Sequence, residues 1–252
     1  MQTPALDGRV AVITGASRGL GKAIALSLSS AGSKIALVAR DMDALNEVAE
    51  QIRSAGGDAE AFQADVTDEE QVRRIEADVP SRFGHVDILV NNAGMNIRKH
   101  LEDFTLDEWE AVLSTNLTSA FLMCRSFVPQ MKGHGYGRII NLTSIMSHVS
   151  LPGRAAYSAS KSGLLGMTKA LALELAAEGI SVVAVSPGPF ATEMNSALIE
   201  DPEMHLRFTS KIPVGRWGNP HEVGDLVRYL CLPESGFITG TDILIDGAWT
   251  AQ

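Results

Sequence analysis

The sequence predicts a single α/β domain: a doubly wound, parallel, seven-stranded sheet flanked by helices on both faces. Short apolar, β-branched runs alternate with longer helical patterns from one end of the chain to the other. Near-continuous apolar runs are typical of strands buried on both faces, and alternation with helices favours a parallel sheet. The 252 residues are enough for one large core, and no low-complexity linker divides them. We therefore predict one domain over residues 1–252.

The predicted elements follow one another in regular order. Seven runs are predicted as strands: 10–13, 35–39, 59–64, 88–90, 138–141, 181–185 and 242–245. Helices are predicted over 21–30, 42–55, 68–83 and 160–178. Segment 187–220, rich in Pro, Gly and Met, does not fit this alternation. Loops of that length are usually functional, so it is predicted to be a substrate lid; the alternative is an extra helix pair without a chemical role.

The composition excludes several classes of protein. Lys and Arg number 21 against 30 Asp and Glu, a net charge of −9, and no local basic run reverses this balance, which argues against nucleic-acid binding. Residues 1–9 lack the apolar core of a signal peptide, and no apolar run approaches the roughly 18 residues that span a membrane. A cytoplasmic protein is expected. Cys124 and Cys231 form no CxxC pair and are expected to be inert core thiols, and the six histidines show no metal-ligand spacing.

A glycine-rich loop lies between the first predicted strand and helix. Residues 14–21 read Thr-Gly-Ala-Ser-Arg-Gly-Leu-Gly. Glycines permit a tight turn and close approach of a pyrophosphate, and the N-terminus of a helix favours negative charge. The spacing differs from the usual Gly-x-Gly-xx-Gly fingerprint, but the position within a βαβ unit predicts nucleotide binding. The candidate residues are Gly15, Ser17, Arg18, Gly19, Leu20 and Gly21.

The end of the second strand indicates which cofactor is used. An NAD enzyme is expected to present Asp or Glu there, whereas this chain has Ala39 followed by Arg40. Two guanidinium groups, of Arg18 and Arg40, suit the 2′-phosphate of NADP(H). NADP(H) is therefore favoured. NAD(H) remains possible, because Asp41 could bond to a ribose hydroxyl instead.

A tyrosine and a lysine four residues apart form a candidate catalytic pair. Tyr157 and Lys161 would share one face of a helix, and Ser144 precedes the tyrosine by thirteen residues. A free phenol has a pKa of about 10, and a nearby positive charge lowers that pKa. Ser144 could then hold a substrate oxygen beside the phenol. The alternative, an ordinary pair of surface neighbours, is the commoner meaning of this spacing when it stands alone.

Together with Asn91-Asn92-Ala93-Gly94, these motifs closely resemble the short-chain dehydrogenase/reductase family over about residues 8–250. The resemblance implies a Rossmann-type fold and a Ser-Tyr-Lys site. Tyr157 would be the general acid in ketone reduction and the base in alcohol oxidation. Lys161 would lower the tyrosine pKa and bind the nicotinamide ribose, Ser144 would bond the substrate carbonyl, and Asn116 would hold a water of a proton relay.

The same resemblance implies further cofactor contacts and an assembly. Contacts to the adenine, the adenosine side and the nicotinamide are implied for Asp65, Val66, Asn92, Ala93, Gly94, Pro187, Gly188 and Thr192. Ser186 stands where many relatives have Asn, which is not expected to abolish cofactor binding. The apolar helix over 160–178 matches a subunit interface of the family, so a homotetramer is expected. Non-enzymatic nucleotide-binding regulators of this fold usually lose the tyrosine or the lysine, and both are present here.

The substrate is expected to lie among residues 95–100, 145–154 and 190–217. Arg98, Lys99 and Arg154 would suit an anion such as a sugar acid, or could be solvated loop cations; His148 could touch substrate or cap a turn. The likeness is greatest to gluconate 5-dehydrogenases and 2-deoxygluconate 3-dehydrogenases, and it rests on the stretches 91–99, 215–218 and 246–249. The alternatives are a 3-oxoacyl-(acyl-carrier-protein) reductase, which shares nearly the same framework, and a general carbonyl reductase. The net charge of −9 weighs slightly against the basic patch that a carrier-protein reductase needs.

Overall fold

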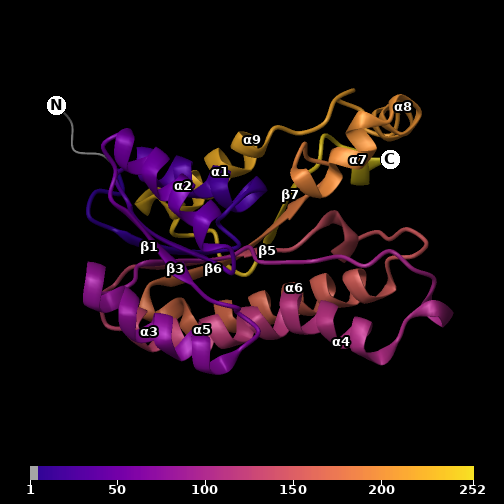
Figure 1. Cartoon of the computed structure of the whole chain (residues 1–252). Helices are drawn as coiled ribbons and strands as arrows, with labels where there is room; N and C mark the ends of the chain where they lie inside the picture. The colour runs from indigo at the N-terminus through magenta and orange to yellow at the C-terminus, as the bar shows by residue number, and fades with distance from the viewer. Residues whose placement is uncertain (1–4) are drawn as a thin grey trace.

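A parallel seven-stranded sheet forms the centre of the molecule in a computed structural model (Figure 1). The structure describes residues 5–252, apart from the side chains of residues 194 and 197, so residues 1–4 of the predicted domain lie outside it. The strand order β3-β2-β1-β4-β5-β6-β7 confirms the predicted fold class. The strands are β1 (Val10–Thr14), β2 (Lys34–Ala39), β3 (Ala59–Gln63), β4 (Ile88–Asn91), β5 (Gly137–Leu142), β6 (Ile180–Pro187) and β7 (Asp242–Ile245).

Helices cover both faces of the sheet. In Figure 1, α1, α2 and α9 lie above it, while α3, α4, α5 and α6 lie below. The short helices α7 and α8 stand at the edge where the strands end, near the C-terminus. The helices are α1 (Gly19–Ser30), α2 (Met42–Ser54), α3 (Glu69–Phe83), α4 (Leu106–Leu113), α5 (Ser119–Met131), α6 (Ala155–Leu175), α7 (Ser196–Glu200), α8 (Pro202–Thr209) and α9 (Pro220–Cys231).

Alternate residues of the central strands supply two apolar cores. In β1, Ala11 and Ile13 belong to the cluster shared with α1, α2 and α9, while Val10 and Val12 belong to the cluster shared with α3, α5 and α6. Successive side chains of a strand point to opposite faces, so a run that is apolar throughout requires cover on both sides. The two cysteines lie in these cores as free thiols, as expected, and burial raises the pKa of each to about 12.

One long helix departs from the expectation about membrane-spanning segments. A π-helical turn, η2 (Ser114–Thr118), joins α4 and α5 into a continuous helix over Leu106–Met131. By length and composition alone this helix could cross a membrane, although half of its most apolar window is buried inside the protein. The expectation considered unbroken apolar runs only, whereas this helix reaches its mean hydropathy with polar residues interspersed among the apolar ones. Contacts with α3 and α6 account for the buried side.

Element boundaries differ from prediction where turn chemistry decides them. Helix α1 begins at Gly19, two residues earlier than predicted, and β6 runs from Ile180 to Pro187, beyond both predicted ends. Helix α9 was not delineated, although the sequence contains its start signal. Asn219 and Glu222 form a capping box there, and Pro220 occupies the first turn. The start of α9 is therefore encoded by its local sequence, even where the hydrophobic pattern does not mark the helix.

Candidate active site

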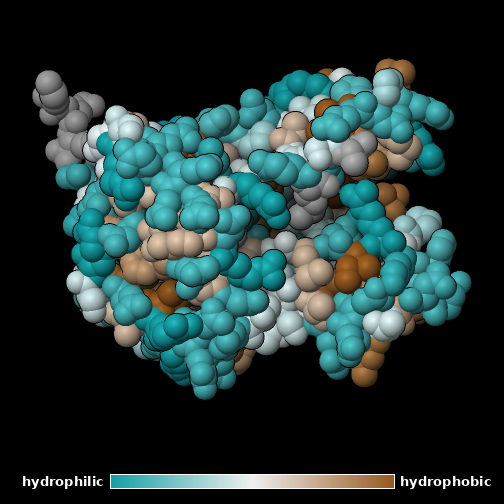
Figure 2. Space-filling view, in the orientation of Figure 1, coloured by the Kyte–Doolittle hydropathy of each residue, from teal (hydrophilic) through white to brown (hydrophobic). Residues whose placement is uncertain are grey.

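A cavity of about 1170 Å³ opens at the carboxyl ends of the strands. It passes the point where the sheet order reverses between β1 and β4, the usual ligand crevice of doubly wound folds. Figure 2 shows a cleft at the right of the molecule, below the part that carries α7 and α8. The predicted cofactor residues that line the cavity are Gly15, Ser17, Arg18, Gly19, Leu20, Arg40, Asp65, Val66, Asn92, Ala93, Gly94, Tyr157, Lys161, Pro187, Gly188 and Thr192.

Gly21 is the one predicted cofactor residue outside the cavity lining, and its role is to let the loop close. A Cβ at this position would stand 2.2 Å from the carbonyl oxygen of Gly15 and 2.5 Å from the side-chain nitrogen of Asn92. Gly15 and Gly19 have positive φ angles of 63° and 55°, which side chains disfavour. The glycine spacing therefore produces a turn in which the backbone itself faces the cavity.

The start of α1 provides a site for an anion. Arg18 is the N-cap residue and its side chain makes no capping bond; the first turn also contains no acidic residue. The first N–H groups of a helix lack intrahelical partners and carry partial positive charge. The cradle therefore fits a phosphate group of a dinucleotide.

Asn92 fastens the end of β4 to this loop. Its Nδ2 donates to the carbonyl oxygens of Thr14, at 2.8 Å, and Gly15, at 3.1 Å. The Thr14 hydroxyl accepts from the backbone nitrogens of Asn92 and Ala93, each at 3.0 Å. The side chain of Asn92 thus has a structural function, and Thr14 is a site residue that the sequence analysis missed. Its position at the carboxyl end of β1 was the available signal.

The end of β2 presents a free guanidinium to the cavity. The Arg40 side chain is 79% exposed and lies 3.8 Å from the Asp65 carboxylate. Such an exposed, long pair is weak, so the guanidinium can turn to a ligand at little cost. The Asp41 carboxylate, by contrast, accepts from the backbone nitrogen of Ala44 at 3.1 Å and caps α2. That bond weakens the case for Asp41 as a partner of a ribose hydroxyl.

Ser144, Tyr157 and Lys161 meet at the inner end of the cavity. Ser144 ends the stretch after β5 as the N-cap of a short 3-10 turn, η3 (Ile145–Ser147), and its hydroxyl accepts from the Met146 nitrogen at 3.1 Å. Tyr157 and Lys161 lie four residues apart on α6, about one turn of the helix. Lys161 is 4% exposed; its ammonium lies 5.8 Å from the centroid of the Tyr157 ring and donates to the Leu142 carbonyl oxygen at 2.6 Å.

The expected lowering of the Tyr157 pKa by Lys161 is not what the structure gives. Burial raises the pKa of Tyr157, and a hydrogen bond with Ser144 and the charge of Arg154 oppose this only in part. Lys161 instead directs its ammonium to a backbone carbonyl, and burial lowers its own pKa to about 8. The phenol is therefore protonated at neutral pH and stands ready to donate a proton beside the Ser144 hydroxyl.

Asn116 lies behind the cavity wall, in the π-helical turn η2. Its Oδ1 accepts from the Met95 nitrogen at 2.8 Å, and its Nδ2 donates to the Met95 carbonyl oxygen and to the Ser160 hydroxyl, each at 2.9 Å. The amide thus fixes the turn after β4 to α6, one residue from Lys161. The expected role in a proton relay stays a prediction.

Three of the five expected substrate residues, Ser144, Arg98 and Arg154, line the cavity and two do not. Arg98 and Arg154 line it, and no ion pair engages either guanidinium in the described part of the chain. Lys99 points elsewhere because it pairs with Glu108, whose pKa it lowers. His148 is also absent from the lining, since its ring bonds to Asp242 at 2.5 Å. These partners favour the alternatives of a loop cation for Lys99 and a turn cap for His148, which is the C-cap of the turn over Ile145–Ser147; substrate contacts of the two residues stay predictions.

An aromatic wall that the sequence analysis did not identify closes the cavity. Phe208 of α8 stacks on Trp217, with ring centroids 5.6 Å apart, and approaches Trp249 of the C-terminal segment at 6.3 Å. The predicted lid segment thus contains a helix pair, and that pair lines the site. Trp249 follows the last strand, and ligands of parallel sheets bind beyond the carboxyl ends of the strands, so its position could have been predicted. The sequence around Phe208 carried no comparable signal.

Comparison with known proteins identifies the family. The family model for enoyl-(acyl carrier protein) reductases matches residues 15–250. The chain belongs to the short-chain dehydrogenase/reductase family. It is therefore an oxidoreductase, as the Ser-Tyr-Lys pattern predicted.

Among the individual relatives, two groups bear on the substrate. A 3-oxoacyl-[acyl-carrier-protein] reductase of Synechocystis sp. is 40% identical over 245 residues, which cover 96% of this chain and 97% of that protein. The corresponding enzyme of Aquifex aeolicus is 37% identical over 243 residues, covering 96% and 97%. Among solved structures, a gluconate 5-dehydrogenase of Burkholderia cenocepacia in complex with NADP and tartrate has a TM-score of 0.94 at 34% identity and covers 99% and 98% of the two chains. Family membership is common to both groups, so the substrate must be argued from the cavity.

Proposed function

We propose that this protein is an NADP(H)-dependent enzyme that interconverts a secondary alcohol and a ketone. The observation that carries the proposal is a half-buried phenol beside a serine hydroxyl and a buried lysine, in a crevice that also contains a phosphate cradle. The glycine loop would hold the pyrophosphate, while Arg18 and Arg40 would hold the 2′-phosphate. NADP(H), when bound, supplies or accepts the hydride; the protein supplies the proton and the orientation.

In the reductive direction, the substrate carbonyl oxygen would accept hydrogen bonds from the Ser144 and Tyr157 hydroxyls. Tyr157 then donates its proton to that oxygen as negative charge develops on it. Such positioned proton transfer contributes about 10²–10⁴-fold to a rate. In the oxidative direction the phenolate takes the proton back from the alcohol. The ammonium of Lys161 would bond the ribose hydroxyls of the cofactor.

We infer that the substrate is a hydroxy or keto acid such as a sugar acid. Burial lowers the pKa of the Arg154 guanidinium, and the nearby charge of Arg98 lowers it further. Two like charges in one partly buried place raise each other's free energy unless an anion joins them. A substrate carboxylate would relieve this repulsion and could be bound in a bidentate manner. The tartrate and the gluconate activity named for the Burkholderia cenocepacia structure support the same class.

A 3-oxoacyl thioester is the second candidate. The curated relatives with this activity match nearly the whole chain. The aromatic wall and the lid residue Leu198 also give the cavity an apolar side that an acyl chain could use. A general carbonyl reductase would use the same side for a neutral ketone.

The decisive experiment follows absorbance at the nicotinamide band with NADPH and a panel of ketones. We expect turnover of a ketogluconate in preference to a short 3-oxoacyl thioester and a neutral ketone. Replacing Arg98 by Gln should raise KM for the keto acid by about 10-fold to 100-fold, because a charge-assisted bond contributes roughly 1.5–3 kcal/mol. KM for the neutral ketone should not change.

Lys99→Gln is the matched control, since the adjacent cation points away from the cavity to Glu108. Arg154→Gln is less clean, because Arg154 also acts on the Tyr157 pKa. Turnover of the thioester without turnover of any keto acid would select the second candidate. An equal effect of Arg98→Gln on charged and neutral ketones would contradict the carboxylate site.

The cofactor preference has its own test. Arg40→Ala should raise KM for NADPH by about 10-fold or more through the lost bond to the 2′-phosphate, and should leave KM for NADH unchanged. Steady-state kinetics with each cofactor measure both values. Arg73→Ala, which removes an arginine of α3 that pairs with Glu76, serves as the control. Equal increases in KM for NADPH and for NADH would show that Arg40 does not bind the 2′-phosphate.

We also propose a cytoplasmic homotetramer. Large apolar side chains are exposed on three helices of the same face: Leu106 on α4, Phe121 on α5 and Leu173 on α6 are 69%, 46% and 85% exposed. Burial of such side chains between copies would be favourable. Gel filtration that returns a monomer at micromolar protein would contradict this assembly.

A further inference from the structure

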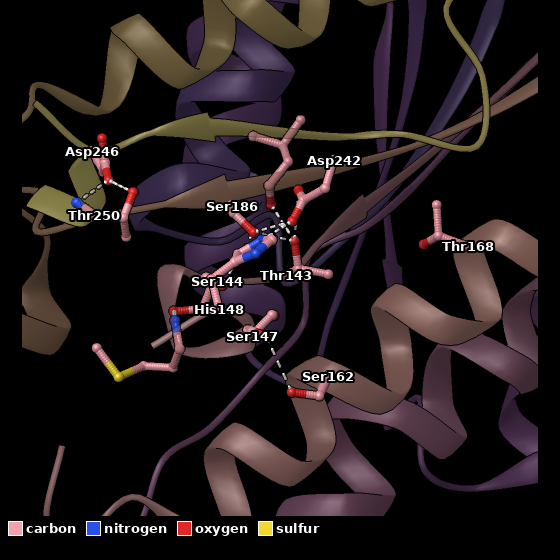
Figure 3. Close-up of polar contacts among 12 residues, drawn as sticks. Thr143, Ser144, Ser147, His148, Ser162, Thr168, Ser186, Asp242, Asp246 and Thr250 are labelled. Atoms are coloured by element: carbon pink, nitrogen blue, oxygen red, sulfur yellow. Dashed lines mark hydrogen bonds and ion pairs between the residues drawn. The ribbon is translucent and has the colours of Figure 1, made fainter. Parts of the chain in front are cut away.

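A buried carboxylate lies behind the catalytic serine, outside the cavity. Asp242 is the first residue of β7, and its side chain is 7% exposed. The His148 ring nitrogen Nε2 lies 2.5 Å from its Oδ2, and the Ser186 hydroxyl donates to the same oxygen at 2.7 Å. Figure 3 shows these side chains converging with Thr143 between β5, β6 and β7. A buried charge requires such partners, because it is otherwise strongly unfavourable.

The number of available hydrogens makes His148 important. The hydroxyls of Thr143 and Ser186 lie 2.8 Å apart and carry one hydrogen each. They face the carbonyl oxygen of Val185 at 2.9 Å, that of Ser144 at 3.1 Å, and the Asp242 carboxylate. Two hydrogens cannot serve all these acceptors at once. An N–H from the imidazole supplies the Asp242 carboxylate from outside the pair, so the single Ser186 hydrogen can be shared in a three-centre bond between the carboxylate and the Ser144 carbonyl oxygen.

The network ties down both ends of the turn η3. Ser144 precedes the turn as its N-cap, and His148 follows it as its C-cap. The Ser144 carbonyl oxygen accepts from the Ser147 nitrogen within the turn, at 2.8 Å, as well as from Ser186. Because the hydroxyl of Ser144 extends from the same backbone, a movement of η3 displaces that hydroxyl from the substrate oxygen.

We propose that His148 and Asp242 act through Ser186 as positioning residues for the catalytic serine. This inference rests on the proposed function, since it assigns the serine hydroxyl to the substrate oxygen. The imidazole does not contact substrate. It donates to the carboxylate, the carboxylate orients the hydroxyl of Ser186, and that hydroxyl holds the backbone of Ser144.

Two replacements of His148 separate positioning from packing. His148→Leu removes the N–H donor, while His148→Gln offers an amide N–H at nearly the same reach. We expect kcat for ketone reduction to fall about 10-fold or more in the Leu variant, because small displacements of a reacting group have effects of up to about 10²-fold. The Gln variant should recover most of the loss. KM for NADPH should stay at the wild-type value in both.

Asp242→Asn provides a second, independent measurement. The carboxamide offers one acceptor oxygen in place of two, so kcat should fall to about the level of His148→Leu. The double variant His148→Leu/Asp242→Asn should lose little more than either single variant, because both lie on one chain of bonds. Ser162→Ala is the matched control: its hydroxyl reaches the Ser147 carbonyl oxygen in the same turn, at 3.5 Å, without joining the network.

The outcomes separate this inference from the proposed function. Wild-type enzyme that reduces no ketone in the panel overturns the proposed function itself. Wild-type kcat in His148→Leu, or a Gln variant no faster than the Leu variant, overturns the network while the function stands. Should the Leu variant fail to fold, a wild-type kcat in Asp242→Asn overturns the network instead.

Discussion

Tyr157→Phe is expected to lower kcat for ketone reduction by about 10²–10⁴-fold, because the phenol is the one acidic side chain positioned to protonate the carbonyl oxygen. The substitution removes a single oxygen atom and keeps the ring that packs near Lys161. KM for NADPH should therefore change little. Steady-state kinetics and direct titration of NADPH measure the two quantities separately.

Tyr229→Phe is the matched control, since Tyr229 lies on α9 and is 48% exposed, away from the cavity lining. Full turnover by the Tyr157 variant would remove this residue from the mechanism.

The pH dependence of the two directions gives a second check on Tyr157. Burial raises the pKa of Tyr157 above its ordinary value of 10. Reduction uses the protonated phenol and should be insensitive to the titration of Tyr157 from pH 7 to 9, whereas oxidation uses the phenolate and should accelerate with pH over that range.

The fold and the cofactor crevice were predictable because both follow from local patterns. Strands buried on two faces appear as continuous apolar runs, and the glycine loop can be recognised because a Cβ at Gly21 would collide with the Gly15 carbonyl. The helix over Leu106–Met131 and the start of α9 were missed, although a capping box marks the latter. Local rules therefore determine most of the framework.

The substrate side was only partly predictable because it depends on which partner each side chain finds. Arg98 and Lys99 are adjacent in sequence, yet one faces the cavity and the other pairs with Glu108 on α4. His148 lies beside the catalytic turn, but its ring forms a hydrogen bond with Asp242, ninety-four residues later. Neither outcome is visible in residue type or spacing, since long-range pairing decides both.

Lys161→Met is expected to abolish most turnover and yet to stabilise the protein at pH 7. Burial lowers the pKa of Lys161 from 10.5 to about 8, a shift that corresponds to a penalty of about 3 kcal/mol for keeping the ammonium inside the fold. Methionine has a similar shape without the charge. The variant also loses the hydrogen bond to the Leu142 carbonyl oxygen, which reduces the gain in unfolding free energy by about 1 kcal/mol. Urea unfolding of the cofactor-free protein should then favour the variant by about 2 kcal/mol.

The sign of the effect must change with pH in a defined window. Below pH 8 the ammonium is protonated in both the folded and the unfolded chain, so wild type carries the full penalty. Between about 8 and 10.5 the folded state releases the proton while the unfolded state keeps it, so wild-type stability rises relative to the variant. Unfolding measured at several pH values from 7 to 10 should show the gap narrowing. Lys169→Met, an exposed lysine two turns further along α6, should show no such trend.

A wild type more stable than Lys161→Met by the same amount at every pH would mean that the ammonium is not penalised in the fold. The expected result instead makes Lys161 a residue kept at a cost to stability, which only a functional demand explains. In the proposed mechanism that demand is an ammonium that binds the ribose of the cofactor. Burial raises the phenol pKa and penalises the ammonium alike, so the same desolvation that favours proton donation by Tyr157 destabilises its neighbour.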